Sequence, residues 1–337
     1  MLAERLRELI RARGPIPFRD WMEAALYDPE FGYYNRSDLK RWGREGDYRT
    51  SAERSELFAA TFARYFAKLY DELGRPSQWT IIEGGAGDGT FARRVQRALQ
   101  EDYPRLFQAT RYHLSEIHNL SEPFDSSHPC LYFSNELLDA FPVHRVTAEG
   151  ELYVTLNSVD NFTWSVGPLS TPRLSEFVAQ HSIKLAPGQI IEVNLAIDDW
   201  LNSVSSKLKR GFVITVDYGA EAADLYDQSL RPNGTLRAFS KHGFVDDVLS
   251  APGEYDITSS VNWTQVKATG ERVGLRLVEF DSQDRFLLRA GLLDELETRL
   301  KRMEKASDQL RLTTDAREMI LPGNMASSFQ VLVQQRR

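Results

Sequence analysis

Apolar residues recur at helical spacing over much of the chain, and Gly and Pro residues interrupt them. Leu2, Leu6 and Ile10 share one face of a first helix, which Gly14-Pro15 ends. The same spacing predicts further helices over these segments: 18–26, 51–73, 91–99, 293–303 and a last one that begins near 307. The sequence therefore predicts a helical N-terminal cap region over residues 1–75 and added helices over residues 287–323.

Short runs of β-branched and aromatic residues predict strands between these helices: Trp79–Ile82, Arg111–Leu114, Cys130–Ser134, Phe212–Val216 and Phe329–Val333. Strands separated by helices favour a mostly parallel, doubly wound sheet that is covered on both faces. Residues 143–190 differ, because Leu152, Val154 and Leu156 alternate with other positions there, which predicts a strand-rich antiparallel insertion. We expect an α/β fold in which residues 1–337 form a single domain with these additions.

The composition is that of a globular protein without cysteine-based sites. Apolar residues make up 42% of the 337 residues, and the formal net charge of −7 disfavours nucleic acid and anionic membranes as partners. Cys130 is the single cysteine, so the sequence offers neither a disulfide framework nor a cysteine-ligated metal site, and we expect no metal. No apolar run has the length that a membrane-spanning helix requires.

The N-terminal segment bears on the compartment of the protein. The first helix is amphipathic and rich in Arg, as mitochondrial transit peptides are, but Glu4 and Glu8 argue against such a peptide. A signal-peptide core is also missing from this segment. We therefore expect a cytoplasmic, bacterial-type chain without a targeting peptide.

A glycine-rich turn follows the first predicted strand. Gly85, Gly87 and Gly89 allow a ligand to approach the backbone closely, and the amides at the start of the next helix can face an anion or a carboxylate. The segment Gly87-Asp-Gly-Thr-Phe-Ala92 fits the loose dinucleotide fingerprint, so a dehydrogenase is one alternative. A plain glycine turn without a ligand is another.

Two acids near this turn favour a different cofactor. Glu83, two residues before Gly85, matches the pattern of S-adenosyl-L-methionine methyltransferases, in which this acid helps hold the methionine ammonium group. Glu116 ends the next strand, where a carboxylate can accept both ribose hydroxyls, and it lies 29 residues past Gly87 rather than the roughly 20 of a dinucleotide fold. The sequence therefore predicts S-adenosyl-L-methionine as the cofactor, bound by these four residues.

Between Asn135 and Pro142 the chain reads Asn-Glu-Leu-Leu-Asp-Ala-Phe-Pro and resembles the MidA family of methyltransferases. The resemblance covers nearly the whole chain, and its motifs occur in order at Trp21-Met22, Gly32-Tyr33-Tyr34, Gly46-Asp47-Tyr48, Thr50-Ser51, Glu83 to Gly87, Glu192, Asp217-Tyr218-Gly219, Gly234 to Arg237, His242 and Pro252 to Thr258. The chain departs from the family pattern at Ala52, Arg54, Asn262 and Ala326.

The resemblance implies a class I, Rossmann-like methyltransferase that uses S-adenosyl-L-methionine. The family's mitochondrial member is an assembly factor for respiratory complex I and methylates an arginine of a complex I subunit, so the implied partner is a protein substrate of that kind. Thr50, Ser51 and Asn135 are then candidates for cofactor contacts, although Thr50 and Ser51 also fit the start of the long helix. We expect neither membrane insertion nor a nucleic-acid partner, and a homodimer is left open.

The acceptor chemistry points to two further acids. A guanidinium is a poor nucleophile, and a carboxylate pair could hold it while drawing charge away from the reacting nitrogen. Glu136 and Asp139 lie three residues apart after a strand end, which places them roughly on one face of a helical turn. The alternatives are a surface acid for Glu136 and a helix N-terminal acid for Asp139. His242 is a candidate base, against the alternative of a structural histidine.

Three interpretations of function follow from these residues. The first is a protein arginine methyltransferase, and the second is a methyltransferase of another nitrogen or of a small molecule. The third is an assembly or scaffold protein that binds S-adenosyl-L-methionine without catalysis.

Overall fold

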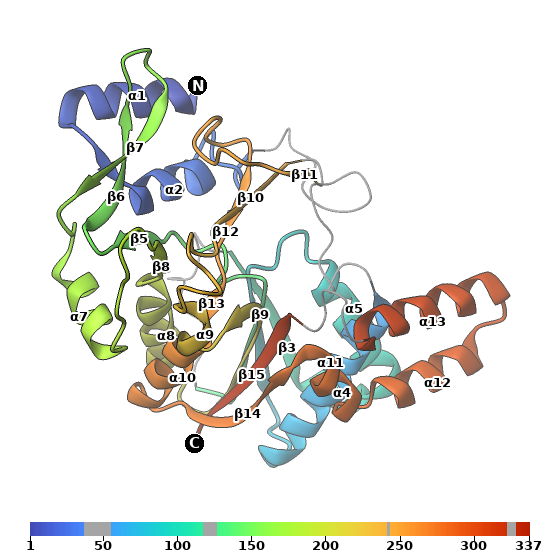
Figure 1. Cartoon of the computed structure of the whole chain (residues 1–337). Coiled ribbons are helices and arrows are strands. Elements are labelled where there is room, and N and C mark those ends of the chain that lie inside the picture. The colour runs from blue at the N-terminus through green and yellow to red at the C-terminus, as the bar shows by residue number, and fades with distance from the viewer. Residues whose placement is uncertain (37–54, 117–126, 241–242, 322–327) are drawn as a thin grey trace. The chain divides into compact units, whose positions relative to one another are not determined.

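The computed structural model describes residues 1–36, 55–116, 127–240, 243–321 and 328–337, which form two compact units (Figure 1). Unit 1 comprises Met1–Tyr48, Leu138–Asp199 and Ala220–Val266, and unit 2 comprises Arg49–Leu137, Trp200–Gly219 and Lys267–Arg337. Helices α8 (Ala196–Lys207) and α10 (Trp263–Arg272) each continue along the chain from unit 1 into unit 2. That residues 1–337 act as a single domain stays a prediction.

A mixed sheet forms the centre of unit 2, with the strand order β14-β15-β9-β4-β2-β3. The neighbours β9-β4-β2-β3 are parallel, whereas β15 is antiparallel to both β9 and β14. This arrangement confirms the predicted α/β fold with a mostly parallel sheet. The strands are β2 (Trp79–Gly84), β3 (Thr110–Ser115), β4 (Cys130–Asn135), β9 (Gly211–Ala220), β14 (Arg276–Ser282) and β15 (Phe329–Arg336).

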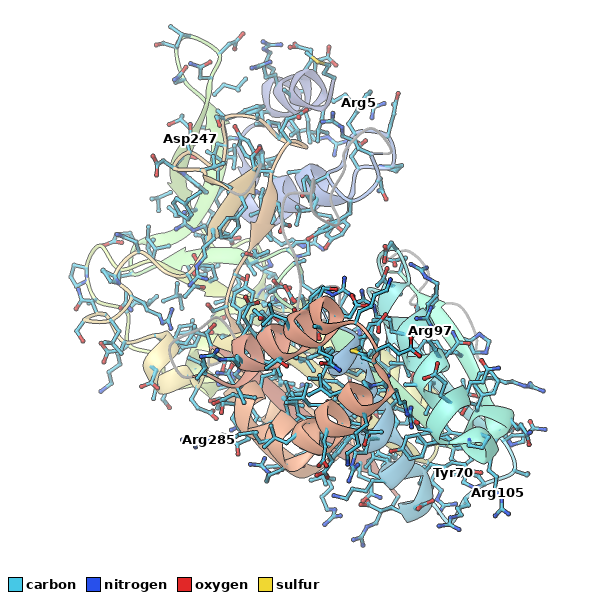
Figure 2. All side chains as sticks on the ribbon, turned by 90° about the vertical axis from the view of Figure 1, so that its right-hand side faces the viewer. Arg5, Tyr70, Arg97, Arg105, Asp247 and Arg285 are labelled. Carbon is cyan, nitrogen blue, oxygen red and sulfur yellow. The ribbon has the colours of Figure 1, made fainter. Side chains whose placement is uncertain are left out.

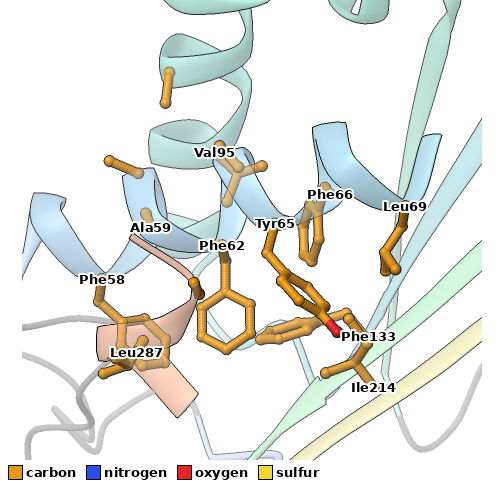
Figure 3. Packing of buried hydrophobic residues seen from close by; sticks show 14 of the residues in the cluster. Phe58, Ala59, Phe62, Tyr65, Phe66, Leu69, Val95, Phe133, Ile214 and Leu287 are labelled. Carbon is orange, nitrogen blue, oxygen red and sulfur yellow. The ribbon is translucent and has the colours of Figure 1, made fainter. Parts of the chain in front are cut away.

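Helices cover one face of this sheet and bury an aromatic cluster. Phe62 of α4 is fully buried and contacts Phe66, Phe91, Phe133 and Phe286 through ring pairs with centroids 5.1 to 6.1 Å apart. Figure 3 shows Phe62 with Phe66 and Phe133. The helices of unit 2 are α4 (Glu56–Glu72), α5 (Thr90–Asp102), α6 (Pro104–Ala109), α11 (Gln283–Arg289), α12 (Leu292–Arg302) and α13 (Ala306–Ile320). The helices α11, α12 and α13 follow β14, as the predicted additions require.

The opposite face of the sheet is covered as well. Tyr132 alternates with Phe133 along β4 and therefore points to the other side, where its ring packs edge-on against Trp200 of α8 at 5.7 Å. The sheet of unit 2 is thus doubly covered, as the spacing of strands and helices along the sequence predicted. On the solvent side, charged residues such as Arg97 of α5 and Arg105 of α6 extend from the ribbon (Figure 2).

Unit 1 contains antiparallel sheets, which confirms the predicted insertion of strands. Its larger sheet has the order β1-β6-β5-β8 with β7 paired to β6, and its smaller sheet has the order β11-β10-β12. The strands of these sheets are β1 (Ile16–Pro17), β5 (His144–Thr147), β6 (Gly150–Leu156), β7 (Phe162–Gly167), β8 (Ile191–Val193), β10 (Arg237–Ser240), β11 (Gly243–Phe244) and β12 (Asp256–Thr258). The short strand β13 (Val261–Asn262) belongs to neither of them. The helices are α1 (Leu2–Arg13), α2 (Phe18–Tyr27), α7 (Pro172–Gln180) and α9 (Ala222–Leu225).

Helix α4 begins at Glu56, and its cap is Ser55, whose Oγ accepts a hydrogen bond from the Leu57 amide at 3.1 Å. Thr50 and Ser51, where the sequence also fits the start of a helix, lie outside the described residues. Leu293, expected on the apolar face of its helix, is 52% exposed. Within the described ranges, no helix has both the length and the apolar character needed to cross a bilayer.

Candidate functional site

Five of the predicted cofactor residues lie at one edge of the sheet of unit 2: Glu83, Gly85, Gly87, Glu116 and Asn135. Because β3, β2, β4 and β9 are parallel, their C-terminal ends lie at the same edge. Gly84 of β2 pairs with Ser115 on one side and with Ser134 on the other, so Glu116 and Asn135 follow directly at this edge. The strand order reverses beside β2, and such a switch point is where open α/β sheets bind their ligands.

The turn after β2 adopts a backbone that suits glycine. Gly85, Gly87 and Gly89 have φ angles of 68°, 56° and 71°, in the left-handed region. The Gly85 amide donates to the Ser115 carbonyl oxygen at 2.8 Å, and a Cβ on Gly85 would lie 3.0 Å from Leu137 Cδ1. The turn therefore requires glycine for its conformation and, at Gly85, also for space.

A carboxylate already occupies the start of helix α5. Asp88 Oδ1 accepts a hydrogen bond from the Thr90 amide at 2.8 Å, and Asp88 Oδ2 accepts one from the Thr90 hydroxyl at the same distance. A pyrophosphate bound in the manner of a dinucleotide would meet this negative charge at the helix N-terminus. The local electrostatics thus disfavour the dehydrogenase alternative.

Glu83 lies buried beside this turn and is hydrogen-bonded to Tyr112. It is 5% exposed, and its Oε2 accepts a hydrogen bond from the Tyr112 hydroxyl at 2.7 Å. The pKa of Glu83 is raised to about 8, mainly by burial; the Tyr112 hydrogen bond opposes this rise, and the carboxylates of Glu116 and Asp88 contribute to it. An ammonium group beside Glu83 would favour its ionised form.

Glu116 is exposed at the end of β3 and faces the glycine turn. Its Oε1 accepts a hydrogen bond from the Gly87 amide at 2.8 Å. Gly87 and Glu116 lie 29 positions apart in the chain, and the sequence assigned both to the same cofactor; this hydrogen bond brings them together. A carboxylate in this place has acceptor sites that suit a pair of hydroxyl groups.

The segment after β4 brings Asn135 and Glu136 to the same edge. Asn135 Nδ2 donates to Glu136 Oε1 at 3.1 Å, and Asn135 Oδ1 is buried with no hydrogen-bond partner among the described residues. Glu136 has a φ of 52°, and its amide donates to the Val216 carbonyl oxygen at 2.9 Å. The Leu137 amide donates to Oδ2 of the fully buried Asp217 at 3.2 Å, so β9 holds this segment at two points.

Asp139 does not stand on a helical turn with Glu136. The residues after β4 form a bend and a turn instead of a helix. Glu136 has a positive φ rather than a helical one, and its amide is hydrogen-bonded to β9. Asp139 belongs to unit 1, where it is 4% exposed and its carbonyl oxygen accepts the Ser259 amide at 2.9 Å. The expected i, i+3 geometry, and with it the alternative of a helix N-terminal acid, is therefore wrong.

Three predicted site residues cannot be placed. Thr50, Ser51 and His242 lie outside the described residues. In the part of the chain that is described, no group of His, Cys, Asp and Glu side chains has an arrangement that could hold a metal ion.

The structure adds residues that sequence reasoning did not assign to the site. Tyr112 reaches Glu83 from the neighbouring strand, and Asp217 fixes the backbone after Asn135. Asp217 ends an apolar run in the sequence, which is a usable signal, whereas nothing in the sequence distinguishes Tyr112. In unit 1, the Tyr34 hydroxyl donates to Asp256 Oδ1 at 2.6 Å and so joins two motifs of the family resemblance.

These groups fit the cofactor that the sequence predicts. Glu83 offers a buried acid for an ammonium group, and Glu116 offers acceptors for hydroxyl groups. Asn135 Oδ1 is a buried acceptor that a ligand could satisfy. Gly85 and Gly87, in the left-handed turn beside these groups, carry no side chains, so a ligand can approach their backbone closely.

Comparison with known proteins identifies the family. The model of the family described as "Putative S-adenosyl-L-methionine-dependent methyltransferase" matches residues 61–122 and 117–280, more than half of the chain. A solved structure described as a "likely methyl transferase" from Burkholderia thailandensis, bound to S-adenosyl-homocysteine, is 27% identical with a TM-score of 0.82, and the match covers 99% of this chain and 92% of that one. A native structure of a protein from the same organism is also 27% identical, with a TM-score of 0.78 and coverages of 99% and 91%.

Curated relatives are more distant. The protein arginine methyltransferase NDUFAF7 homolog, mitochondrial, of Drosophila melanogaster is 26% identical over 81% of this chain and 70% of its own length. The protein arginine methyltransferase NDUFAF7, mitochondrial, of Homo sapiens is 23% identical over 95% of this chain and 80% of its own length. With a sheet and a glycine turn of the expected kind and a family model that matches most of its length, the chain belongs to this family of S-adenosyl-L-methionine-dependent methyltransferases.

Proposed function

We propose that this protein transfers a methyl group to an arginine side chain of a protein, with a subunit of respiratory complex I as the first acceptor to test. The cofactor class rests on the family match, and the choice of arginine rests on relatives named protein arginine methyltransferase. The observation that carries the proposal is the position of Glu136, a carboxylate at the C-terminal edge of the parallel strands, held there by Asn135 and β9.

The residues at this edge have distinct tasks in the proposal. S-adenosyl-L-methionine supplies an electrophilic methyl group whose leaving group is a neutral thioether, so no acid has to protonate it. The protein then mainly positions the reactants and arranges charge. Glu83 would hold the ammonium group of the cofactor, and Glu116 would hold its ribose hydroxyls. The backbone of the Gly85–Gly87 turn would lie next to the cofactor.

Glu136 is the proposed acceptor-binding carboxylate. A guanidinium donates two parallel hydrogen bonds to a carboxylate, which fixes its plane and draws positive charge toward the bound nitrogens. Asn135 keeps the Glu136 side chain oriented through the 3.1 Å hydrogen bond. Asp139 stays a prediction for the same task, and His242 stays a prediction as the base that takes the released proton.

The test is a transfer assay that identifies the acceptor atom. The purified protein is incubated with methyl-labelled S-adenosyl-L-methionine and proteins from a strain that lacks this gene, and the label is located by peptide mass spectrometry. A complex I subunit of the same organism is assayed alongside, with each modified Arg replaced by Lys as the matched control. Label on arginine that disappears in the Lys variant supports the proposal.

Other outcomes decide between the remaining interpretations. Label on another nitrogen, or in the small-molecule fraction alone, contradicts arginine as the acceptor and favours the second interpretation. Cofactor binding without transfer to any fraction, together with normal cellular function of a Glu136→Gln variant, favours the scaffold interpretation and contradicts the enzyme.

A further inference from the structure

Tyr112 is placed to act on the cofactor-binding acid from the neighbouring strand. Parallel pairing sets Tyr112 of β3 opposite Ile81 of β2, so its ring shares a face of the sheet with Ile81 and with Glu83, two positions further. The ring packs against the same aliphatic and aromatic core to which Ile81 belongs. From that fixed position the hydroxyl reaches Glu83 Oε2 at 2.7 Å.

The contact has a defined donor and a defined acceptor. Burial and, to a lesser extent, the Glu83 carboxylate raise the pKa of Tyr112 well above its usual range. The hydroxyl therefore stays protonated and donates a hydrogen bond to the carboxylate. The hydrogen bond also opposes the rise in the pKa of Glu83 and therefore favours the ionised carboxylate. The ionised form is the one that attracts an ammonium group.

We propose that Tyr112 is a positioning residue for cofactor binding, which holds the Glu83 carboxylate in the orientation that receives the amino-acid end of S-adenosyl-L-methionine. The tyrosine acts through Glu83 and does not itself touch the reacting methyl group. A core-packed ring with one fixed hydroxyl suits this task, because the carboxylate loses little further freedom when the ligand binds. The adenosine end of the cofactor is not expected to sense Tyr112.

Tyr112 should affect the binding of two ligands differently, because the ligands differ at the amino-acid end. S-adenosyl-homocysteine carries the ammonium group, whereas 5′-methylthioadenosine keeps the adenosine and the sulfur but lacks the amino-acid part. Calorimetric titration of both ligands into wild type and Tyr112→Phe measures each dissociation constant without any methyl transfer. We expect Tyr112→Phe to weaken the affinity for S-adenosyl-homocysteine by about tenfold or more, the effect typical of a hydrogen bond to a charged group. The affinity for 5′-methylthioadenosine should stay within about twofold of that of the wild type.

Controls distinguish positioning from a structural role. Tyr65 also donates a hydrogen bond to a glutamate in unit 2, to Glu279 Oε2 at 3.1 Å, and so Tyr65→Phe is the matched control that should change neither ligand. The titrations are repeated over a range of pH, because loss of the hydrogen bond should move the rise in S-adenosyl-homocysteine affinity to higher pH. The ratio of variant to wild-type constants cancels the ligand's own titration.

A double-mutant cycle completes the test. If Tyr112 acts through Glu83, Tyr112→Phe should have little further effect on S-adenosyl-homocysteine in a Glu83→Gln background. Equal losses for both ligands, or additive losses in the cycle, would show that Tyr112 only supports the fold and would overturn the proposal. If the wild-type protein binds neither ligand, cofactor binding itself is contradicted. That outcome differs from one in which the wild type binds both ligands and Tyr112→Phe affects them equally.

Discussion

The backbone amide of Gly87 donates a 2.8 Å hydrogen bond to Oε1 of Glu116, so the acid at the end of β3 lies against the glycine turn after β2. The two residues belong to neighbouring parallel strands whose C-terminal ends share one edge. Glu116 thereby has a fixed position while it remains exposed to an incoming ligand. Its carboxylate is the group that we propose binds the ribose hydroxyls of the cofactor.

Glu116→Ala should weaken S-adenosyl-homocysteine and 5′-methylthioadenosine alike, because both carry the ribose. Hydrogen bonds to a charged group contribute about 1.5–3 kcal/mol, so losses of roughly tenfold to a hundredfold are expected. Calorimetric titration measures both constants. Glu101→Ala is the control, since Glu101 is an exposed acid near the C-terminal end of α5. A loss confined to S-adenosyl-homocysteine would contradict a ribose contact.

Gly87→Ala should abolish cofactor binding more than it lowers stability. Gly87 has a φ of 56°, and a Cβ in the left-handed region costs roughly 1–2 kcal/mol. Gly74 has a φ of 81° with no atom within 4 Å of an added Cβ, so Gly74→Ala carries a similar strain at the end of α4, away from the turn. We expect both variants to lose similar stability in urea unfolding, and Gly87→Ala alone to lose binding. Equal binding by the two variants would remove the turn from the cofactor site.

The stability of the ligand-free protein should depend on pH through Glu83. Its pKa is about 8 in the folded protein, against an ordinary value of 4.5. Between these values the unfolded chain binds fewer protons than the folded one, so the free energy of unfolding falls as pH rises and levels off above the folded pKa. The effect amounts to roughly a few kcal/mol at most.

Urea unfolding from about pH 5.5 to about pH 8.5 measures this slope. Glu83→Gln stays neutral throughout and should flatten it, whereas Glu101→Gln, at an exposed position of α5, should not. Saturating S-adenosyl-homocysteine should also reduce the slope, because a bound ammonium group favours the ionised carboxylate. An unchanged slope in Glu83→Gln would assign the pH dependence to other groups.

Local sequence signals were sufficient for strands β2, β3, β4, β9 and β15 and for the turn, whereas β14 was not predicted. Trp79–Gly84 is a compact apolar run that ends in an acid and glycines, so both the strand and its end could be located. The acid after the next strand could be assigned in the same way, because Glu116 directly follows β3. These features depend on neighbours in the chain.

Contacts between strands could not be predicted from local patterns. The hydrogen bond from Tyr112 to Glu83 depends on the parallel register of β3 with β2, and that from the Leu137 amide to Asp217 joins positions 80 apart. The spacing of Glu136 and Asp139 fits a helix, but the bond from the Glu136 amide to β9 holds the backbone at positive φ instead. Tertiary contacts override local propensity at this point.

Phe62→Ala should be severely destabilising. Phe62 is fully buried in the aromatic cluster, where it contacts rings from α4, α5, β4 and α11. Truncation of a buried Phe costs about 3–5 kcal/mol, through lost burial and the cavity that remains. Leu310→Ala, on the exposed side of α13 at 70% exposure, should change the free energy of unfolding by less than about 0.5 kcal/mol. Urea unfolding of both variants tests the location of the core.

Glu136→Gln should remove methyl transfer while it leaves the cofactor site intact. Glutamine keeps the length of the side chain and its hydrogen bond with Asn135, but it lacks the charge that holds a guanidinium. Loss of one such electrostatic contact typically lowers kcat by about a hundredfold or more. S-adenosyl-homocysteine affinity should stay within about twofold of wild type, because Glu83 and Glu116 are unchanged.

The matched control for this variant is Glu149→Gln, an exposed acid between β5 and β6 in unit 1. It should leave both transfer and binding at wild-type levels, since its charge is not at the strand ends. Loss of S-adenosyl-homocysteine binding in Glu136→Gln would place this acid with the cofactor instead of the acceptor. Full transfer by Glu136→Gln would exclude it from acceptor binding, and Asp139, which is buried, would then be the next acid to test, because it is the other carboxylate that the sequence assigned to the acceptor.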